Sequence, residues 1–122
     1  MEELARRAVA CKGWRWMPGM LVHNADGPVR IDGGDSDPFI YGRCQWSGER
    51  FQLSVRSGPC PDLTDPATVG CLLALVREAY RLRLWLASSR DGDMWYVDAA
   101  SGALAHGKTE GEALVTALEA AP

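Results

Sequence analysis

Two stretches of alternating apolar and polar residues, separated by a short turn, constrain this 122-residue chain more than any other feature. They are FIYGRCQW at 39–46 and RFQLSVR at 50–56. Successive side chains of a β-strand point to opposite faces, so each stretch is typical of a strand with one apolar face. The sequence therefore predicts an antiparallel hairpin that packs on a core with one face and meets solvent with the other. The apolar face consists of Ile40, Cys44, Trp46, Phe51, Leu53 and Val55.

The parity of the turn decides how these two strands pair, because a one-residue slip turns every side chain to the other face. An even turn at Ser47–Gly48 pairs Cys44 with Phe51 and Ile40 with Val55. We expect this register, since an odd turn would set apolar side chains against polar ones. The polar face then carries Tyr41, Arg43, Gln45, Arg50, Gln52 and Arg56.

The arginines on this polar face are a candidate binding surface. A guanidinium group binds carboxylates and phosphates through paired N–H donors, so Arg43, Arg50 and Arg56 would suit an acidic protein or a nucleic acid. The same side chains are also compatible with an ordinary solvated face. The sequence leaves both interpretations open.

Helical spacing and capping residues predict three helices around the strands. The first covers the opening segment and ends at Gly13, the middle one begins with Asp65 as its N-cap, and the last opens with Thr109 and Glu112 in a capping box. With the strands between them, the order is α-β-β-β-β-α-β-β-β-α. We predict a single α+β domain over residues 1–122, with its sheet covered by helices.

Inside the middle helix, Gly70 costs about 1 kcal/mol relative to alanine. A close approach to a neighbouring element would offset that cost. The segment CKGWRWMPGM at 11–20 then sets two tryptophans around one arginine. Taken as a strand, it points Trp14 and Trp16 to the same side. They either pack on a helix in the core or form an aromatic interface patch with Arg15 or Arg43 at its rim.

A second hairpin is predicted in LRLWLASSRDGDMWYVD at 82–98. Asp91-Gly92 is a favoured pair for a type I′ turn. Pairing through it aligns Leu86 with Val97 and Ser88 with Trp95 on one face, while Ala87 opposes Tyr96 on the other, with Trp85 and Met94 nearby. Both faces are largely apolar. Either helices cover both sides, or the face with Trp85 and Tyr96 binds a partner.

Composition excludes several classes of protein. A net charge of −3, with 47% hydrophobic residues, is neither the basic excess of a general nucleic-acid binder nor the composition of a disordered chain. The opening residues do not read as an export signal, and no apolar run approaches 18 residues. We therefore expect a soluble cytoplasmic protein without a membrane role. The sequence does not indicate its oligomeric state.

Residues that could carry chemistry form no recognised pattern. No two of the cysteines have C-x-x-C spacing, which favours four small buried hydrophobes. The loop DGGDSDP at 32–38 has glycine at the third position of a calcium loop, so we expect a solvated acidic loop. We predict no enzyme, no cofactor and no metal site, and we expect His23 and His106 at the surface. The cysteines are Cys11, Cys44, Cys60 and Cys71.

Three stretches carry a resemblance to a family. RRAVACKGWRWMPGM at 6–20, PDLTDPATVGCLLALVREAY at 61–80 and EGEALVTALEAAP at 110–122 resemble a group of small tailed-phage and prophage accessory proteins. That group has no assigned activity, so the resemblance implies a phage origin. Small phage accessory proteins are often inhibitors that bind host machinery, including anti-CRISPR and other anti-defence proteins.

The C-terminal third is also similar to HicB-type antitoxin domains. In WYVDAASGALAHGKTEGEALVTALEAA at 95–121, Gly107, Thr109, Glu112 and Ala113 match the turn that leads from a strand meander into a helix. The residue after the threonine departs from that pattern, and the DNA-binding extension is missing. This likeness implies a β-β-β-α architecture and not a function.

From these observations we expect a phage accessory protein of the host-cell cytoplasm that binds a host or phage macromolecule, with a protein as the expected partner and an anti-defence inhibitor as the specific form. A nucleic-acid or nucleotide binder that uses the same arginines is one alternative, and a small hydrolytic or metal enzyme is the other.

Overall fold

The computed structural model describes residues 2–33 and 38–122, which form three α-helices, one short 3-10 helix and eight strands. The predicted α+β order is confirmed, with a two-residue strand, β5, added before the middle helix. In chain order the elements are α1 (Glu2–Ala10), β1 (Leu21–His23), β2 (Val29–Gly33), β3 (Phe39–Cys44), β4 (Arg50–Ser54), η1 (Val55–Ser57), β5 (Cys60–Pro61), α2 (Pro66–Tyr80), β6 (Trp85–Ser88), β7 (Trp95–Ala99), β8 (Gly102–Gly107) and α3 (Glu110–Glu119).

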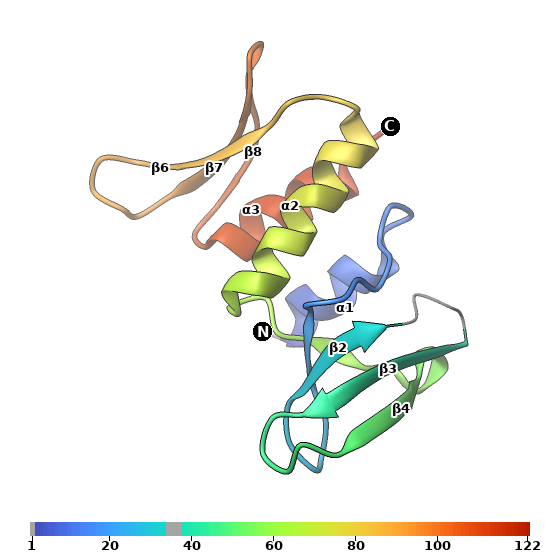
Figure 1. The fold of residues 1–122 in the computed structure, drawn as a ribbon. Helices are drawn as coiled ribbons and strands as arrows, with labels where there is room; N and C mark the ends of the chain where they lie inside the picture. Colours follow the sequence, from blue (N-terminus) through green and yellow to red (C-terminus); the bar gives the residue numbers. More distant parts are fainter. Residues whose placement is uncertain (1, 34–37) are drawn as a thin grey trace.

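The strands form two antiparallel sheets. One is five-stranded in the order β4-β3-β2-β1-β5, and the other is the meander β6-β7-β8. Figure 1 shows the helices in the middle of the molecule, with one sheet at either end. Each sheet therefore packs on helices with one face and turns its other face away from them.

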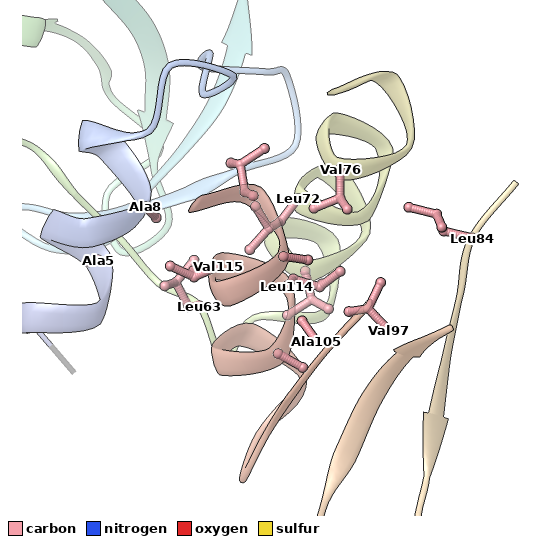
Figure 2. Packing of buried hydrophobic residues seen from close by; sticks show 14 of the residues in the cluster. Ala5, Ala8, Leu63, Leu72, Val76, Leu84, Val97, Ala105, Leu114 and Val115 are labelled. Atoms are coloured by element: carbon pink, nitrogen blue, oxygen red, sulfur yellow. The ribbon is translucent and has the colours of Figure 1, made fainter. Parts of the chain in front are cut away.

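Two hydrophobic clusters lie under the two sheets. The cluster under the five-stranded sheet joins Val22, Ile31 and Ile40 of its strands to Trp16, Met20 and Leu75. The cluster under the meander joins Val97 and Ala105 to both α2 and α3, as Figure 2 shows. Helix α2 contributes to both clusters, through Leu75 on one side and through Leu72 and Val76 on the other. It is the element on which the two halves of the fold meet.

The start of α2 is held by the predicted N-cap. The carboxylate of Asp65 accepts from the backbone N–H of Thr68, and Leu21 N donates to the Thr68 hydroxyl at 2.9 Å. The helix thus begins where it meets strand β1. The suggestion that a neighbour approaches Gly70 closely is wrong, because a Cβ added there would meet no heavy atom within 4 Å.

The β3–β4 hairpin has the predicted faces but not the predicted partners. Ile40 pairs with Leu53, and not with Val55, so the register is shifted by two residues. The turn has four residues, 45–48, in which the Gly48 N–H donates to the Cys44 carbonyl at 2.8 Å. Trp46 consequently leaves the apolar face and is 77% exposed in the turn. An even shift preserves the faces, because side chains alternate with a period of two.

The β6–β7 hairpin has the predicted partners but not the predicted turn. Leu86 pairs with Val97, Ala87 with Tyr96 and Ser88 with Trp95. Asp91, however, does not adopt the positive φ that a type I′ turn requires, and only Gly92 does, at 75°. The loop is four residues long and centred on the same pair, which is why the register is unchanged.

The segment with the paired tryptophans is not a strand. Backbone hydrogen bonds from Trp14 to Cys11 and from Met20 to Met17 close turns on either side of it. The two indoles meet edge to face, with ring centroids 5.3 Å apart, and Trp16 is buried. Both rings pack against the hydrophobic clusters, which makes the core interpretation the correct one.

Candidate arginine interface

Three arginines stand in one row across the uncovered face of the five-stranded sheet. Arg30 of β2 pairs with Arg43 of β3, and Arg43 pairs with Arg50 of β4. Their strand neighbours Val29, Ile31 and Cys44 point to the core and are buried. Alternation along each strand therefore places all three guanidinium groups on the outer face. We call Arg30, Arg43 and Arg50 the arginine row.

Like charges directly opposite each other on adjacent strands destabilise a sheet, and two carboxylates offset that cost here. Asp32 Oδ2 lies 3.2 Å from Arg50 Nη1 and 3.9 Å from Arg43 Nε. Asp65 Oδ2 lies 2.6 Å from Arg30 Nη1. Arg43 and Arg50 share a single carboxylate, and Arg43 Nη1 also donates to the Gly48 carbonyl at 3.2 Å. The two side chains remain 56% and 53% exposed, which leaves further N–H donors open to solvent.

Aromatic residues continue the same face along β3. Tyr41 is half-buried and lies opposite Gln52, and Phe39 is exposed opposite Ser54. The outer face thus combines guanidinium groups at one end of β3 with two aromatic rings toward the other. Arginine and tyrosine in this arrangement are typical of the residues that dominate binding energy at protein interfaces.

The row differs from the sequence prediction at one position. Arg56 does not belong to it, because the chain leaves β4 after Ser54 and enters η1, where Ser57 donates to the Ser54 carbonyl. Arg30 takes its place in the row. The alternation of Val29 and Ile31 with Arg30 was visible in the sequence, but the β2–β3 pairing that aligns Arg30 with Arg43 was not.

The second predicted surface, the outer face of the meander, is also uncovered. Trp85 is 44% exposed there, and Tyr96 is half-buried. Tyr96 lies opposite His106, with ring centroids 6.2 Å apart, and opposite Ala87 on its other side. The helices pack on the other face of this sheet, through Val97 and its neighbours. This surface is aromatic, with exposed His106 at its far strand.

The expectation of four buried cysteines is wrong for three of them, because Cys11, Cys60 and Cys71 are half-buried and only Cys44 is buried. Hydrogen bonding with Ser47 lowers the pKa of Cys44, whereas the other three thiols are not activated. Burial raises the pKa of Cys11, Cys60 and Cys71, which keeps these thiols protonated near neutral pH. His23 lies opposite Cys60 on β1 and β5, and its Nε2 is 3.3 Å from Asp62 Oδ2. A thiol beside an imidazole is the arrangement that a nucleophile–base pair requires. The raised pKa of Cys60 argues against its use as a nucleophile.

The predicted acidic loop falls largely outside the described residues. Asp32 lies in β2, where its carboxylate forms ion pairs with the arginine row. The other three candidates, Asp35, Ser36 and Asp37, lie outside the described residues. Within residues 2–33 and 38–122, no three His, Cys, Asp or Glu side chains gather closely enough to hold a metal ion.

An open hollow of about 560 Å³ lies between α1 and α3. Arg7 and Glu119 line it and bind each other through two hydrogen bonds, of 3.0 and 2.7 Å. Arg7 and Glu119 thereby satisfy each other, and Lys12 is the other charged side chain that lines the hollow.

Comparisons of this chain with family models, with curated proteins and with solved structures gave no match. None of the helices in the described part of the chain has the length and apolar character that a membrane span needs.

Proposed function

We propose that this protein acts by binding and not by catalysis, and that the arginine row docks on an acidic surface of a partner protein. One observation carries the proposal. Arg43 and Arg50 lie opposite each other on an uncovered sheet face, are more than half exposed, and share one carboxylate. A partner's carboxylates would complete the hydrogen bonding of both side chains.

The spacing of the row suits such a partner. Adjacent strands lie about 4.8 Å apart, so two guanidinium forks in one row match carboxylates presented at similar intervals. Binding would also relieve the repulsion between the paired arginines, which a single Asp32 offsets only in part. Tyr41 and Phe39 would add apolar contact area beside the charged groups.

A protein partner is favoured over a nucleic acid by charge. The chain carries a net charge of −3, and Asp32 lies within the row itself. A polyanion would be repelled by the molecule as a whole, whereas a local acidic patch on a protein would not. Nucleic-acid binding through the same arginines would lose affinity steeply with salt, and a salt titration therefore distinguishes the two.

The resemblance to small phage and prophage proteins adds the biological setting to this proposal. An accessory protein that covers an acidic surface of a host defence complex would inhibit it without a reactive centre.

The test is affinity capture from infected cells with a tagged protein, followed by mass spectrometry. We expect Arg43→Glu/Arg50→Glu to lose the partner that the wild-type protein captures. A control with the same change in charge, Arg6→Glu/Arg90→Glu, alters exposed arginines elsewhere and should retain it. If thermal melting shows that charge reversal beside Asp32 lowers the stability of the protein, the neutral variant Arg43→Gln/Arg50→Gln replaces the charge-reversal variant. Equal capture by all variants would overturn the assignment of the row.

A further inference from the structure

Strand β6 forms one edge of the meander, and its outward backbone groups can be identified. Ser89 N donates to Met94 O at 2.8 Å, so the residues of β6 that bond to β7 are, by alternation, Trp85 and Ala87. The N–H and C=O groups of Leu86 and Ser88 therefore point away from the sheet. Among the described residues, none makes a recorded hydrogen bond to these four groups on the outward side.

This edge lacks the features that protect sheet edges from pairing. Proteins guard an exposed edge with charged residues, proline or a bulge. On the opposite edge, β8 has an extra residue, Leu104, that breaks its register, and β4 of the other sheet carries Arg50. The four residues of β6, WLAS, contain no charge, proline or bulge, and the first of them, Trp85, is half-exposed.

The chain preceding and following β6 carries opposite charges. Arg81 and Arg83 come before the strand, and the hairpin loop that follows it carries Asp91 and Asp93 together with one basic residue, Arg90. All five residues are exposed. In an antiparallel pair of two β6 strands, the arginines that precede the strand in one copy lie beside the aspartates that follow it in the other. Such a pair is therefore complementary in charge as well as in backbone groups.

We propose that β6 pairs with β6 of a second copy of this chain, about a two-fold axis through Ala87. In this register Leu86 of each copy lies opposite Ser88 of the other, and the free backbone groups form four hydrogen bonds. The two Ala87 side chains face each other at the axis, where a small residue allows close approach. The result is a continuous six-stranded sheet with the helices of both copies on one side.

The register leaves the existing contacts of this edge intact. The carbonyl of Leu84 also points outward, and it already accepts hydrogen bonds from Arg77 Nε at 2.9 Å and Arg77 Nη2 at 2.7 Å. Pairing centred on Leu86 would compete with that guanidinium, whereas pairing centred on Ala87 uses only the groups of Leu86 and Ser88. The structure thus favours one register over its neighbour.

The mass of the protein in solution over a concentration series tests the pairing. Sedimentation equilibrium should show the mass rising from 13.3 kDa toward twice that value. Ser88→Pro removes one outward N–H per copy but no bond to β7, and should weaken association about 30-fold. If circular dichroism shows that Ser88→Pro does not fold, Ala87→Lys, which places two like charges at the axis, replaces it. A wild-type monomer throughout, or a folded edge variant that dimerises normally, would overturn the proposal.

The register itself can be tested by cross-linking. Facing residues of a pair without hydrogen bonds have Cα atoms about 4.5 Å apart, within the range of a disulfide. Ala87→Cys should therefore form a covalent dimer on mild oxidation, beyond any background from the native thiols of the wild-type protein. His106→Cys places a thiol on the same face but on β8, and should add nothing to that background. Equal cross-linking of the two variants would refute the register.

A further pair of substitutions tests the charge complementarity. Arg83→Asp and Asp91→Arg should each weaken association, because each places like charges side by side across the axis. The double variant should restore it. A double variant that stays as weak as the single ones would overturn the antiparallel arrangement. None of these changes alters the arginine row, so the outcome is independent of the proposed function.

Discussion

Replacing Asp65 by alanine tests how the two halves of this fold are joined. Oδ2 of Asp65 accepts three hydrogen bonds, from Arg30 Nη1 at 2.6 Å, Thr68 N at 3.0 Å and Thr68 Oγ1 at 2.9 Å. Loss of an N-cap costs about 1 kcal/mol. Loss of a hydrogen bond to a charged group costs about 1.5–3 kcal/mol, toward the lower end here because Arg30 is partly exposed. We therefore expect Asp65→Ala to lower the free energy of unfolding by roughly 2–4 kcal/mol.

Asp65→Asn separates the two contributions. Asparagine is as good an N-cap as aspartate, so this variant keeps the cap and loses only the charge that Arg30 faces. Its cost should be about half that of the alanine variant. An Asp65→Asn cost as large as that of Asp65→Ala would show that the cap contributes nothing.

The ion pair also predicts a dependence on pH. Burial opposes ionisation of Asp65, but hydrogen bonds from Arg30 and Thr68 outweigh it, and the pKa of this carboxyl lies below its usual value. A group with a lower pKa in the folded state stabilises the fold above the unfolded pKa of about 3.9, and that stability is lost as pH falls through the folded pKa. The stability difference between wild type and Asp65→Asn should therefore be constant from neutral pH to about pH 5 and shrink below about pH 4.

Urea unfolding followed by tryptophan fluorescence measures the cost of Asp65→Ala and the cost of Asp65→Asn. Repeating it across this pH range gives the pH dependence of the second cost. The reasoning is refuted if Asp65→Ala costs less than about 0.5 kcal/mol, the scatter of ordinary surface substitutions. It is also refuted if the difference between wild type and Asp65→Asn grows as the pH falls.

Three further changes address separate parts of the molecule. Gly70→Ala should raise the free energy of unfolding by about 0.5–1 kcal/mol in thermal melting, because the surroundings of an added Cβ are empty and alanine is the better helix former. Tyr80→Phe should lower it by about 1 kcal/mol in urea titration, since the hydroxyl donates to the Ala117 carbonyl at 2.7 Å. Asp32→Asn should change it by less than about 1 kcal/mol in urea titration, because both ion pairs of this carboxylate lie at the exposed surface, and a larger loss would contradict that reading.

Local turn and capping chemistry explains the parts of the fold that could be predicted. The pairing of Leu86 with Val97 follows from a loop centred on Asp91-Gly92, whatever its turn type, because the centre alone sets the register. The start of α2 follows from Asp65, whose side chain accepts from the backbone N–H of Thr68, three residues further along the chain. Both predictions depend on residues that lie close together in the chain.

The arginine row could be predicted only in part, because it depends on pairing between strands that no short pattern specifies. Arg43 and Arg50 were predicted, since one hairpin contains both. Arg30 joins them through the β2–β3 pairing, and Asp65 reaches Arg30 from 35 positions away in the chain. Arg56 was misplaced because alternation continues through Ser54 in the sequence, whereas the backbone turns there into η1.

The two carboxylates of the row have different roles, which follow from their exposure. The Asp65 side chain is 12% exposed and caps a helix, so a binding partner would have to unfold the start of α2 to replace it. The Asp32 side chain is 36% exposed and its shortest hydrogen bond to the row is 3.2 Å. A carboxylate supplied by a partner can bind Arg43 and Arg50 beside Asp32, but it cannot replace Asp65 at Arg30. Binding would therefore add ion pairs at the β3–β4 end of the row, while Arg30 keeps the sheet attached to the helix.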